Sequence, residues 1–267
     1  MFDPNGTVAE RRLEIDRYHR LNCAPTVVID MDVGIEPALL LLEQINQAIP
    51  QGQARISLRD LVIKATALAL QKNPIYHSAY DGKFMLVPSE GIDIGTPIPE
   101  GQSSIIAVVK NADKLTLAGI ASEVQKAHDE ASSEHERLAA RPWHAGKTFL
   151  GVAAFSAGGL GRMLRSRLPV LERRWLRAEH QKLGGFMVTD VSSDGVTACH
   201  GQLTQPLLSS LTMLAIKNEV STENGIVRIK KMLPLALGFD HRLLDAGGSS
   251  RFLTEIRNLL ESPEALK

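Results

Sequence analysis

The stretch that most constrains this chain lies near its C-terminus, where an apolar run leads directly into a charged cluster. The run from Met232 to Phe239 predicts a buried strand, and Asp240-His241-Arg242 follows it at once. Small residues then release the chain into an amphipathic helix, predicted over Ser249 to Leu260. A histidine at the end of a buried strand suits proton transfer at neutral pH. The alternative is a half-buried, hydrogen-bonded structural histidine, which is the commoner use of a lone residue of this kind.

Helical and extended patterns are interleaved along the rest of the chain. A hairpin-type turn at Asp81-Gly82 joins two short strands, and Ser57 is placed to cap the helix that ends at Asn73-Pro74. This mixed order favours an α/β fold, a two-layer sandwich of mixed sheet and helices, over a doubly wound nucleotide-binding fold. The predicted strands are 26–33, 78–80, 83–87, 92–98, 104–110, 186–191, 211–216 and 226–231, and the predicted helices are 38–48, 57–72 and 116–141.

Composition excludes several classes of partner. The 267 residues carry 30 basic and 30 acidic side chains, so no net charge recruits nucleic acid or an anionic membrane surface. Cys23 and Cys199 form neither a metal-binding pair nor a disulfide framework, so we expect no metal site and a reducing compartment. The N-terminus has no apolar signal core, and no window approaches the ~20 apolar residues of a spanning helix. We therefore expect a cytoplasmic protein with no membrane partner.

Residues 142–183 are the least regular part of the sequence. Gly158 to Gly161 superficially resembles a phosphate-binding loop, but no Gly-Lys-Ser/Thr follows it. The arginine-rich segment 162–177 comes next, interrupted by Pro169 and interleaved with leucines. It is either a patch that binds phosphate or an acidic partner, or an amphipathic helix pair with a solvated basic face.

Three sequence blocks together resemble the catalytic domain of the dihydrolipoyl acyltransferases of 2-oxo acid dehydrogenase complexes, a family related to chloramphenicol acetyltransferase. The family signature is Asp-His-Arg-x-x-Asp-Gly followed by a helix with Arg-Phe-Leu. The matching segments are 240–245 with 251–253, the helix 63–70 with the Asp81-Gly82 turn and 92–95, and the segment 109–114. The resemblance covers roughly residues 11 to 266 and implies a chloramphenicol acetyltransferase-like, trimeric fold.

The resemblance also implies roles for three residues. His241 takes the position of the general base that removes the proton from the thiol of coenzyme A or dihydrolipoamide. Asp245 takes that of the aspartate that braces the loop around this histidine. Thr189, at the end of Phe186-Met187-Val188-Thr189, aligns with the hydroxyl that stabilises the oxyanion of the tetrahedral intermediate. In this family the two halves of a site come from adjacent subunits, so Thr189 would serve the neighbour's His241.

Several features depart from the family pattern. Ala246 replaces the glycine after the motif aspartate, although Gly247-Gly248 could absorb a one-residue shift. Threonine replaces serine at position 189, which keeps the hydroxyl but stiffens its rotamer. We divide the chain into an N-terminal arm, 1–24, and an acyltransferase-type domain, 25–267, with an arginine-rich insertion at about 142–183.

No lipoyl domain precedes the catalytic region, and Asp113-Lys114-Leu115 is rejected as a lipoyl attachment site because it lies inside a catalytic-domain block. The expected activity is acyl transfer between coenzyme A, a substrate, and a thiol of dihydrolipoamide or another carrier on a separate protein. The expected assembly is a homotrimer or a multiple of trimers. The alternatives are a catalytically impaired scaffold subunit and an arginine-rich insertion that docks an acidic carrier protein. The residues that bind coenzyme A and the acyl group are not identified by the sequence.

Overall fold

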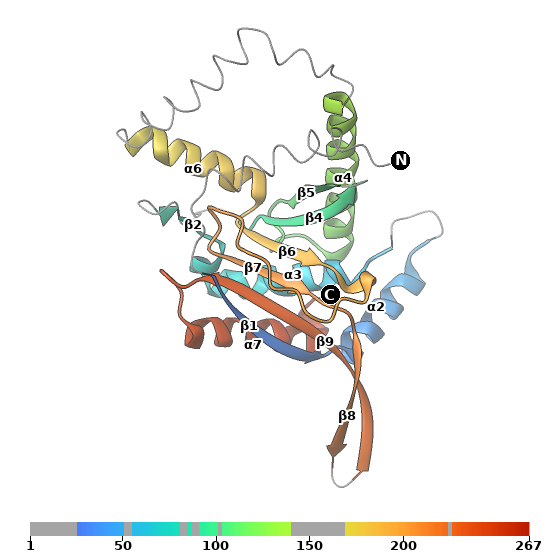
Figure 1. Ribbon diagram of the computed structural model, residues 1–267. Helices are drawn as coiled ribbons and strands as arrows, with labels where there is room; N and C mark the ends of the chain where they lie inside the picture. The colour runs from blue at the N-terminus through green and yellow to red at the C-terminus, as the bar shows by residue number, and fades with distance from the viewer. Residues whose placement is uncertain are drawn as a thin grey trace, which may run out of the picture.

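A computed structural model describes residues 26–50, 55–80, 85–86, 91–100, 103–139, 169–223 and 226–266. Its centre is a seven-stranded sheet in the order β1-β9-β7-β6-β4-β5, with β8 paired to the outer part of β9 (Figure 1). The strands are β1 (Thr26–Gly34), β4 (Ile94–Glu100), β5 (Ser103–Val109), β6 (Phe186–Asp190), β7 (Ser209–Met213), β8 (Lys217–Glu223) and β9 (Ile226–Asp240).

The sheet is mixed. The β4–β6 and β6–β7 pairs are parallel, and the pairs of β9 with β1, β7 and β8 are antiparallel, as is β4–β5. A separate two-stranded sheet joins β2 (Ala79–Tyr80) to β3 (Met85–Leu86). The strands expected on either side of the Asp81-Gly82 turn are therefore present, and the turn itself lies outside the described residues. The predicted mixed α/β sandwich is confirmed.

Four helices pack on one another and against the sheet. Helix α3 contacts α2, α4 and α7, while α7 lies along β1 and α4 along β5. Helix α6 lies apart from this group and contacts β5, β2 and β3. The helices are α2 (Glu36–Ala48), α3 (Leu58–Lys72), α4 (Leu117–Ala139), α6 (Pro169–Leu183) and α7 (Ala246–Glu261), and the short 3₁₀ turns are η1 (Pro74–His77), η3 (Ser192–Asp194) and η4 (Pro263–Leu266).

Helix α3 is the central helix, and polar contacts hold its N-terminal end and its middle. Ser57 caps it as predicted: its Oγ accepts from Asp60 N at 3.4 Å, and Asp60 Oδ2 accepts from Ser57 N at 2.8 Å. Lys64 is buried, and its Nζ donates to the carbonyl oxygens of Asp113 (2.9 Å) and Leu115 (2.6 Å). Desolvation lowers the pKa of Lys64. The 109–114 block of the sequence is thus a turn tied to α3.

Strand β9 has its odd-numbered side chains facing the helices. Leu233, Leu235, Leu237 and Phe239 are fully buried in the main core. Because side chains alternate across a strand, the even-numbered residues Met232 to Asp240 lie on the other side of the sheet. The predicted buried strand is therefore correct, and it delivers His241 at the edge of the core.

The structure differs from the predicted elements in five places. Residues 226–231 and 232–239 form one continuous strand, and the predicted strand 211–216 is β7, which ends at Met213. Strand β8 was not predicted because its sequence, Lys-Asn-Glu-Val-Ser-Thr-Glu, is mostly polar. Helix α7 begins at Ala246 and not at Ser249, and Pro169 begins α6 where an interruption was expected. The N-terminal arm and the Gly158 to Gly161 segment lie outside the described residues.

Candidate active site

His241 is the first residue after β9 and is held by its own loop. Its Nδ1 lies 2.9 Å from the carbonyl oxygen of Leu244, and its ring meets that of Phe239 edge-on, with centroids 6.1 Å apart. A carbonyl oxygen can only accept, so Nδ1 of the neutral ring carries the hydrogen and Nε2 keeps its lone pair. The residue is exposed. The loop therefore offers a fixed imidazole whose basic nitrogen is accessible.

An ion pair fixes the backbone on either side of the histidine. Asp240 is fully buried, and Arg242 binds it through Nη2 to Oδ2 at 2.6 Å and through Nε to both carboxylate oxygens at 3.0 and 3.1 Å. The guanidinium also lies over the ring of Tyr80, 5.1 Å from its centroid. The hydrogen bonds to Asp240 raise the pKa of Arg242. The carbonyl of Asp240 accepts from the amides of Leu243 and Leu244, which closes the turn.

Asp245 caps the N-terminus of α7. Its Oδ1 accepts from Gly248 N at 2.6 Å, and its carbonyl accepts from Ser249 N at 3.0 Å. No hydrogen bond between Asp245 and His241 is present among the described residues. The aspartate therefore influences the position of the histidine only through the backbone between them. This geometry agrees better with Asp245 orienting the histidine loop than with Asp245 transferring a proton directly.

Two glycines, and not Ala246, make the closest approaches of this cap. Ala246 is exposed in the first turn of α7. The close approaches occur one and two residues later: a Cβ at Gly247 would lie 3.3 Å from Asp245 Oδ1, and one at Gly248 would lie 3.1 Å from the hydroxyl of Tyr76. The small residues that the cap requires are therefore present at Gly247 and Gly248.

Tyr76 braces the far side of this cap and was not predicted from the sequence. Its hydroxyl lies 3.4 Å from Ser249 Oγ, its ring stacks on Phe252 with centroids 4.3 Å apart, and its carbonyl accepts from Ser209 Oγ at 2.6 Å. Desolvation raises the pKa of the Tyr76 hydroxyl. Tyr76 is far from the motif in sequence, so no local pattern could have connected the two.

Thr189 lies in the sheet but far from His241 of its own chain. Phe186 and Val188 face the helices, so Thr189 points to the opposite side of β6. It is in register with Thr212 on β7, which pairs with Ala236 on β9. Ala236 precedes His241 by five residues along β9, and two strand spacings separate Ala236 from Thr189. Together these offsets place Thr189 and His241 roughly 15–20 Å apart. One chain therefore does not bring the predicted base and the predicted hydroxyl together.

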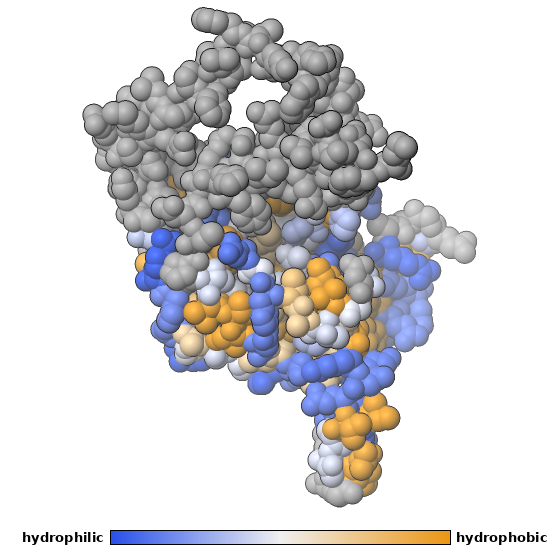
Figure 2. Space-filling model, viewed as in Figure 1, coloured by the Kyte–Doolittle hydropathy of each residue, from blue (hydrophilic) through white to orange (hydrophobic). Residues whose placement is uncertain are grey.

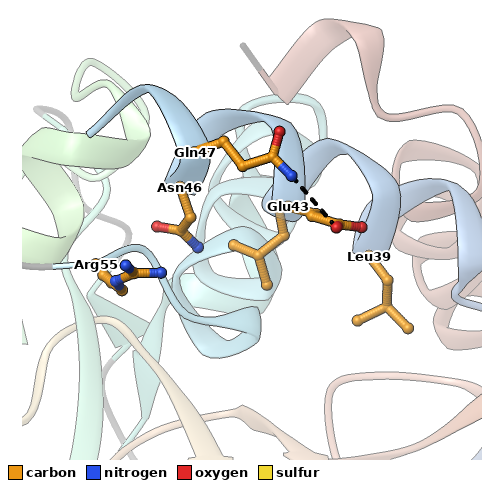
Figure 3. Close-up of a pocket in the computed structure, with 6 residues that line it drawn as sticks. Leu39, Glu43, Asn46, Gln47 and Arg55 are labelled. Atoms are coloured by element: carbon orange, nitrogen blue, oxygen red, sulfur yellow. Dashed lines mark hydrogen bonds between the residues drawn. The ribbon is translucent and has the colours of Figure 1, made fainter. Parts of the chain in front are cut away.

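The described pocket is at the other end of the sheet. It has a volume of about 410 Å³ and lies along α2, where Gln47 Nε2 donates to Glu43 Oε1 at 3.3 Å (Figure 3). Helix α2 follows Gly34, which pairs with Met232, whereas His241 follows Asp240, which pairs with Thr26. The pocket is therefore separate from the histidine loop. Its lining residues are Leu39, Leu42, Glu43, Asn46, Gln47 and Arg55.

The described residues contain no cluster of three or more histidine, cysteine or acidic side chains that could hold a metal ion. None of the described helices has the length and hydropathy needed to cross a bilayer. In α6, which contains the described part of the arginine-rich segment, Arg174 and Arg177 are exposed, whereas Leu176 and His180 are buried. For α6, this arrangement agrees with the second interpretation, an amphipathic helix pair with a solvated basic face; the other predicted helix of the pair lies outside the described residues.

The sequence matches the family model of the 2-oxoacid dehydrogenases acyltransferase catalytic domain over residues 14–140 and 170–267. The chain belongs to this family of acyltransferase catalytic domains. The match is interrupted at residues 141–169, while the domain boundaries given above stay a prediction.

Two curated proteins with similar sequences are named as acyltransferase components of dehydrogenase complexes. The chain is 24% identical over 222 residues to the dihydrolipoyllysine-residue succinyltransferase component of the 2-oxoglutarate dehydrogenase complex of Bacillus subtilis, covering 83% of this chain and 43% of the relative. It is 26% identical over 201 residues to the lipoamide acyltransferase component of the branched-chain alpha-keto acid dehydrogenase complex of the same organism, covering 75% and 38%. The chain thus spans about half the length, or less, of these two relatives.

Solved structures support the fold. A dihydrolipoamide acetyltransferase of Azotobacter vinelandii superposes with a TM-score of 0.72 at 18% identity, covering 96% of this chain and 89% of that chain. That structure comes from an investigation of a serine, a histidine and an asparagine in the catalytic mechanism of the acetyltransferase. A chloramphenicol acetyltransferase superposes with a TM-score of 0.51 at 14% identity, covering 93% and 94%. The expected chloramphenicol acetyltransferase-like architecture is therefore confirmed.

Proposed function

We propose that this protein transfers an acyl group between coenzyme A and the thiol of dihydrolipoamide, or of another carrier borne by a separate protein. The observation that carries the proposal is the hydrogen bond from His241 Nδ1 to the Leu244 carbonyl, which leaves the lone pair on Nε2 of an exposed residue. A thiol of pKa about 8.5 is only slightly ionised at neutral pH. A base fixed in this way supplies the proton acceptor that thiol attack requires.

The steps follow from these groups. Nε2 of His241 takes the proton as the sulfur attacks the thioester carbonyl carbon, which becomes tetrahedral and carries the negative charge on oxygen. The intermediate collapses by breaking the bond to the original sulfur, and the imidazolium returns its proton to that leaving thiolate. The hydroxyl of Thr189 donates to the oxyanion, which typically contributes ~10²- to 10³-fold to the rate.

The proposed site combines two subunits of a homotrimer. Within one chain Thr189 and His241 lie far apart, as the strand register requires. Thr189 also faces away from its own helices, toward the side of the sheet where another subunit can approach. The catalytic residues proposed are thus His241 and Thr189 from neighbouring subunits, with Asp245 as the residue that positions the histidine loop.

A comparison in chain order supports this assignment. In the Azotobacter vinelandii acetyltransferase the investigated residues are a serine, a histidine and an asparagine. The intervals between them, in that protein's own numbering, equal those from Thr189 to His241 and from His241 to Asp245. The residues matched by these intervals are also chemically similar, because threonine keeps the hydroxyl of serine and both aspartate and asparagine can cap a helix.

The test is a His241→Ala variant assayed for acyl transfer from acyl-coenzyme A to dihydrolipoamide. Loss of the base is expected to lower kcat by ~10²- to 10⁴-fold. His200→Ala is the matched control, since His200 is half exposed and pairs with Asp30 on β1. A His241→Ala variant that kept the parental rate would exclude the mechanism. Calorimetry with coenzyme A then separates the enzyme from a scaffold subunit, because the scaffold predicts no heat even at millimolar concentrations.

A further inference from the structure

A second threonine lies beside Thr189 on the neighbouring strand. Thr189 and Thr212 are in register in the parallel pair of β6 and β7. Leu211 and Met213 are buried in the core on the helix side, so Thr212, like Thr189, points to the opposite side of the sheet. Because neighbouring strands are about 5 Å apart, the two threonine side chains lie next to each other. Thr212 is therefore the immediate neighbour of the proposed oxyanion donor.

The sheet is covered on the β9 side of Thr212. Ala236, which pairs with Thr212, is only 2% exposed. Leu203, from the segment between β6 and β7, is buried close to this strand: a Cβ added at Gly238 would lie 3.8 Å from Leu203 Cδ2. A group that approaches Thr189 therefore has no access to the β9 part of this side of the sheet.

The sheet is also covered below Thr189 on its own strand. Met187, two residues before Thr189 on the same face, is buried and packs with Leu183 of α6. Between these two covered parts, Thr189, Ser210 and Thr212 stay partly exposed. We call these three residues the threonine strip. The strip is narrow, and Thr212 occupies the side of it that faces β9.

Broad apolar surface lies elsewhere on the molecule. Most of the exposed large hydrophobic side chains of the described chain belong to residues 216–229, on or beside the hairpin that β8 and β9 form (Figures 1 and 2). This hairpin is at the opposite end of β9 from His241. Recognition of an acyl group beside Thr189 therefore depends on its fit to the threonine strip and not on a large hydrophobic surface.

We infer that Thr212 is a specificity-determining residue that limits the size of the acyl group next to the thioester carbonyl. The carbonyl oxygen must lie about 3 Å from the Thr189 hydroxyl, so the first carbons of the acyl group lie beside the Thr212 side chain. That side chain is β-branched and has few rotamers with which to move aside. An acetyl group fits beside it, whereas the branched carbon of an isobutyryl group contacts it. The inference rests on the acyl transfer and the role of Thr189 proposed above.

The experiment compares kcat/KM for isobutyryl-coenzyme A and acetyl-coenzyme A, with dihydrolipoamide as the acceptor. Thr212→Ala removes the branch and is expected to raise the isobutyryl-to-acetyl ratio by about 10-fold or more, the usual effect of methyl-sized differences in a binding pocket. Thr212→Val keeps the branched shape without the hydroxyl, so it should keep the parental ratio. Ser210→Ala is the matched control on the same strand and face, because Ser210 is in register with Met187 and not with Thr189.

A milder variant and a binding measurement complete the test. Thr212→Ser removes only the methyl group, so its ratio should rise in the same direction as that of Thr212→Ala. Calorimetry with the two acyl-coenzyme A compounds measures the same selectivity as a ratio of Kd values, and it does not require turnover.

The outcomes separate this inference from the proposed function. An unchanged ratio in Thr212→Ala, or an equal rise in Thr212→Val or Ser210→Ala, would overturn the inference while acyl transfer by the parent stands. A parent that binds both compounds without transferring the acyl group would contradict the proposed function, and the Kd ratios would still decide the role of Thr212. A parent that binds neither compound would overturn both.

Discussion

Asp240 and Arg242, the residues on either side of His241, bind each other through a 2.6 Å contact between Oδ2 and Nη2, with the carboxylate fully buried. The pair fixes the backbone before and after the histidine. Removing one partner of a buried ion pair leaves an uncompensated charge and costs far more than the pair itself contributes.

Arg242→Met is therefore expected to lower the free energy of unfolding by about 3 kcal/mol. It should also lower kcat, because the loop around His241 loses one of its supports. Arg257→Met is the control: the pair of Arg257 with Glu261 is partly exposed and 3.8 Å long, so its loss should cost less than about 1 kcal/mol. Denaturant unfolding measures both, and equal losses would contradict the account given for Arg242.

Asp245 offers a test of capping against proton chemistry. Asp245→Ala removes the acceptor for Gly248 N and should cost about 1 kcal/mol, with a fall in kcat. Asp245→Asn keeps an acceptor oxygen without a titratable group, so its stability should stay within a few tenths of a kcal/mol of the parent. If the asparagine variant lost as much activity as the alanine variant, the aspartate would have to act through its charge.

The shared site predicts complementation between inactive chains. His241→Ala and Thr189→Val subunits each lack one half of the site, yet a mixed assembly contains interfaces where an intact His241 meets an intact Thr189. Co-expressed variants carrying different affinity tags, purified through both tags, should transfer acyl groups well above the rate of either variant alone. A mixed assembly with no more activity than its parents would contradict a site shared by His241 and Thr189 of neighbouring subunits.

Acid should destabilise the protein through a buried histidine. His77 is 4% exposed, its Nδ1 has no partner among the described residues, and its carbonyl contacts His180 Nε2 at 2.9 Å. Burial, with a smaller contribution from His180, lowers the pKa of His77 to about 4, while Asp113 and Asp93 oppose this shift. The unfolded chain therefore takes up a proton near pH 6.5, where the folded chain does not.

The resulting loss of stability has a defined pH window. The contribution of His77 is complete above about pH 6.5, declines as the pH falls toward 4 and levels off below it, for a total on the order of 3 kcal/mol. Urea unfolding of the parent and of His77→Gln between pH 7 and pH 4 measures it. The variant should lose less stability on acidification, and parallel slopes for the two proteins would exclude His77 as the cause.

Much of this molecule could be predicted from its sequence, and the failures have physical reasons. The cap at Ser57 and the buried run before His241 are local patterns, so they were found. Strand β8 was missed because its residues are polar and its identity as a strand depends on pairing with β9. The start of α7 was placed too late because Gly247-Gly248 has the composition of a turn, and only the position of Asp245 beside Gly248 N makes it a helix. Bracing by Tyr76 and Tyr80 depends on tertiary contacts that no local pattern records.

The unbroken register of β9 limits where residues can be inserted or deleted as the sequence evolves. Gain or loss of a single residue between Leu233 and Asp240 would exchange the two sides of the strand, sending the core leucines to the opposite surface and rotating His241 away from its loop. The constraint does not apply to the end of the hairpin beyond Val227, because the register of the core part of β9 does not depend on the length of the hairpin. Insertions and deletions are therefore expected at the hairpin tip in related sequences, and the segment that leads to the histidine is expected to keep a constant length.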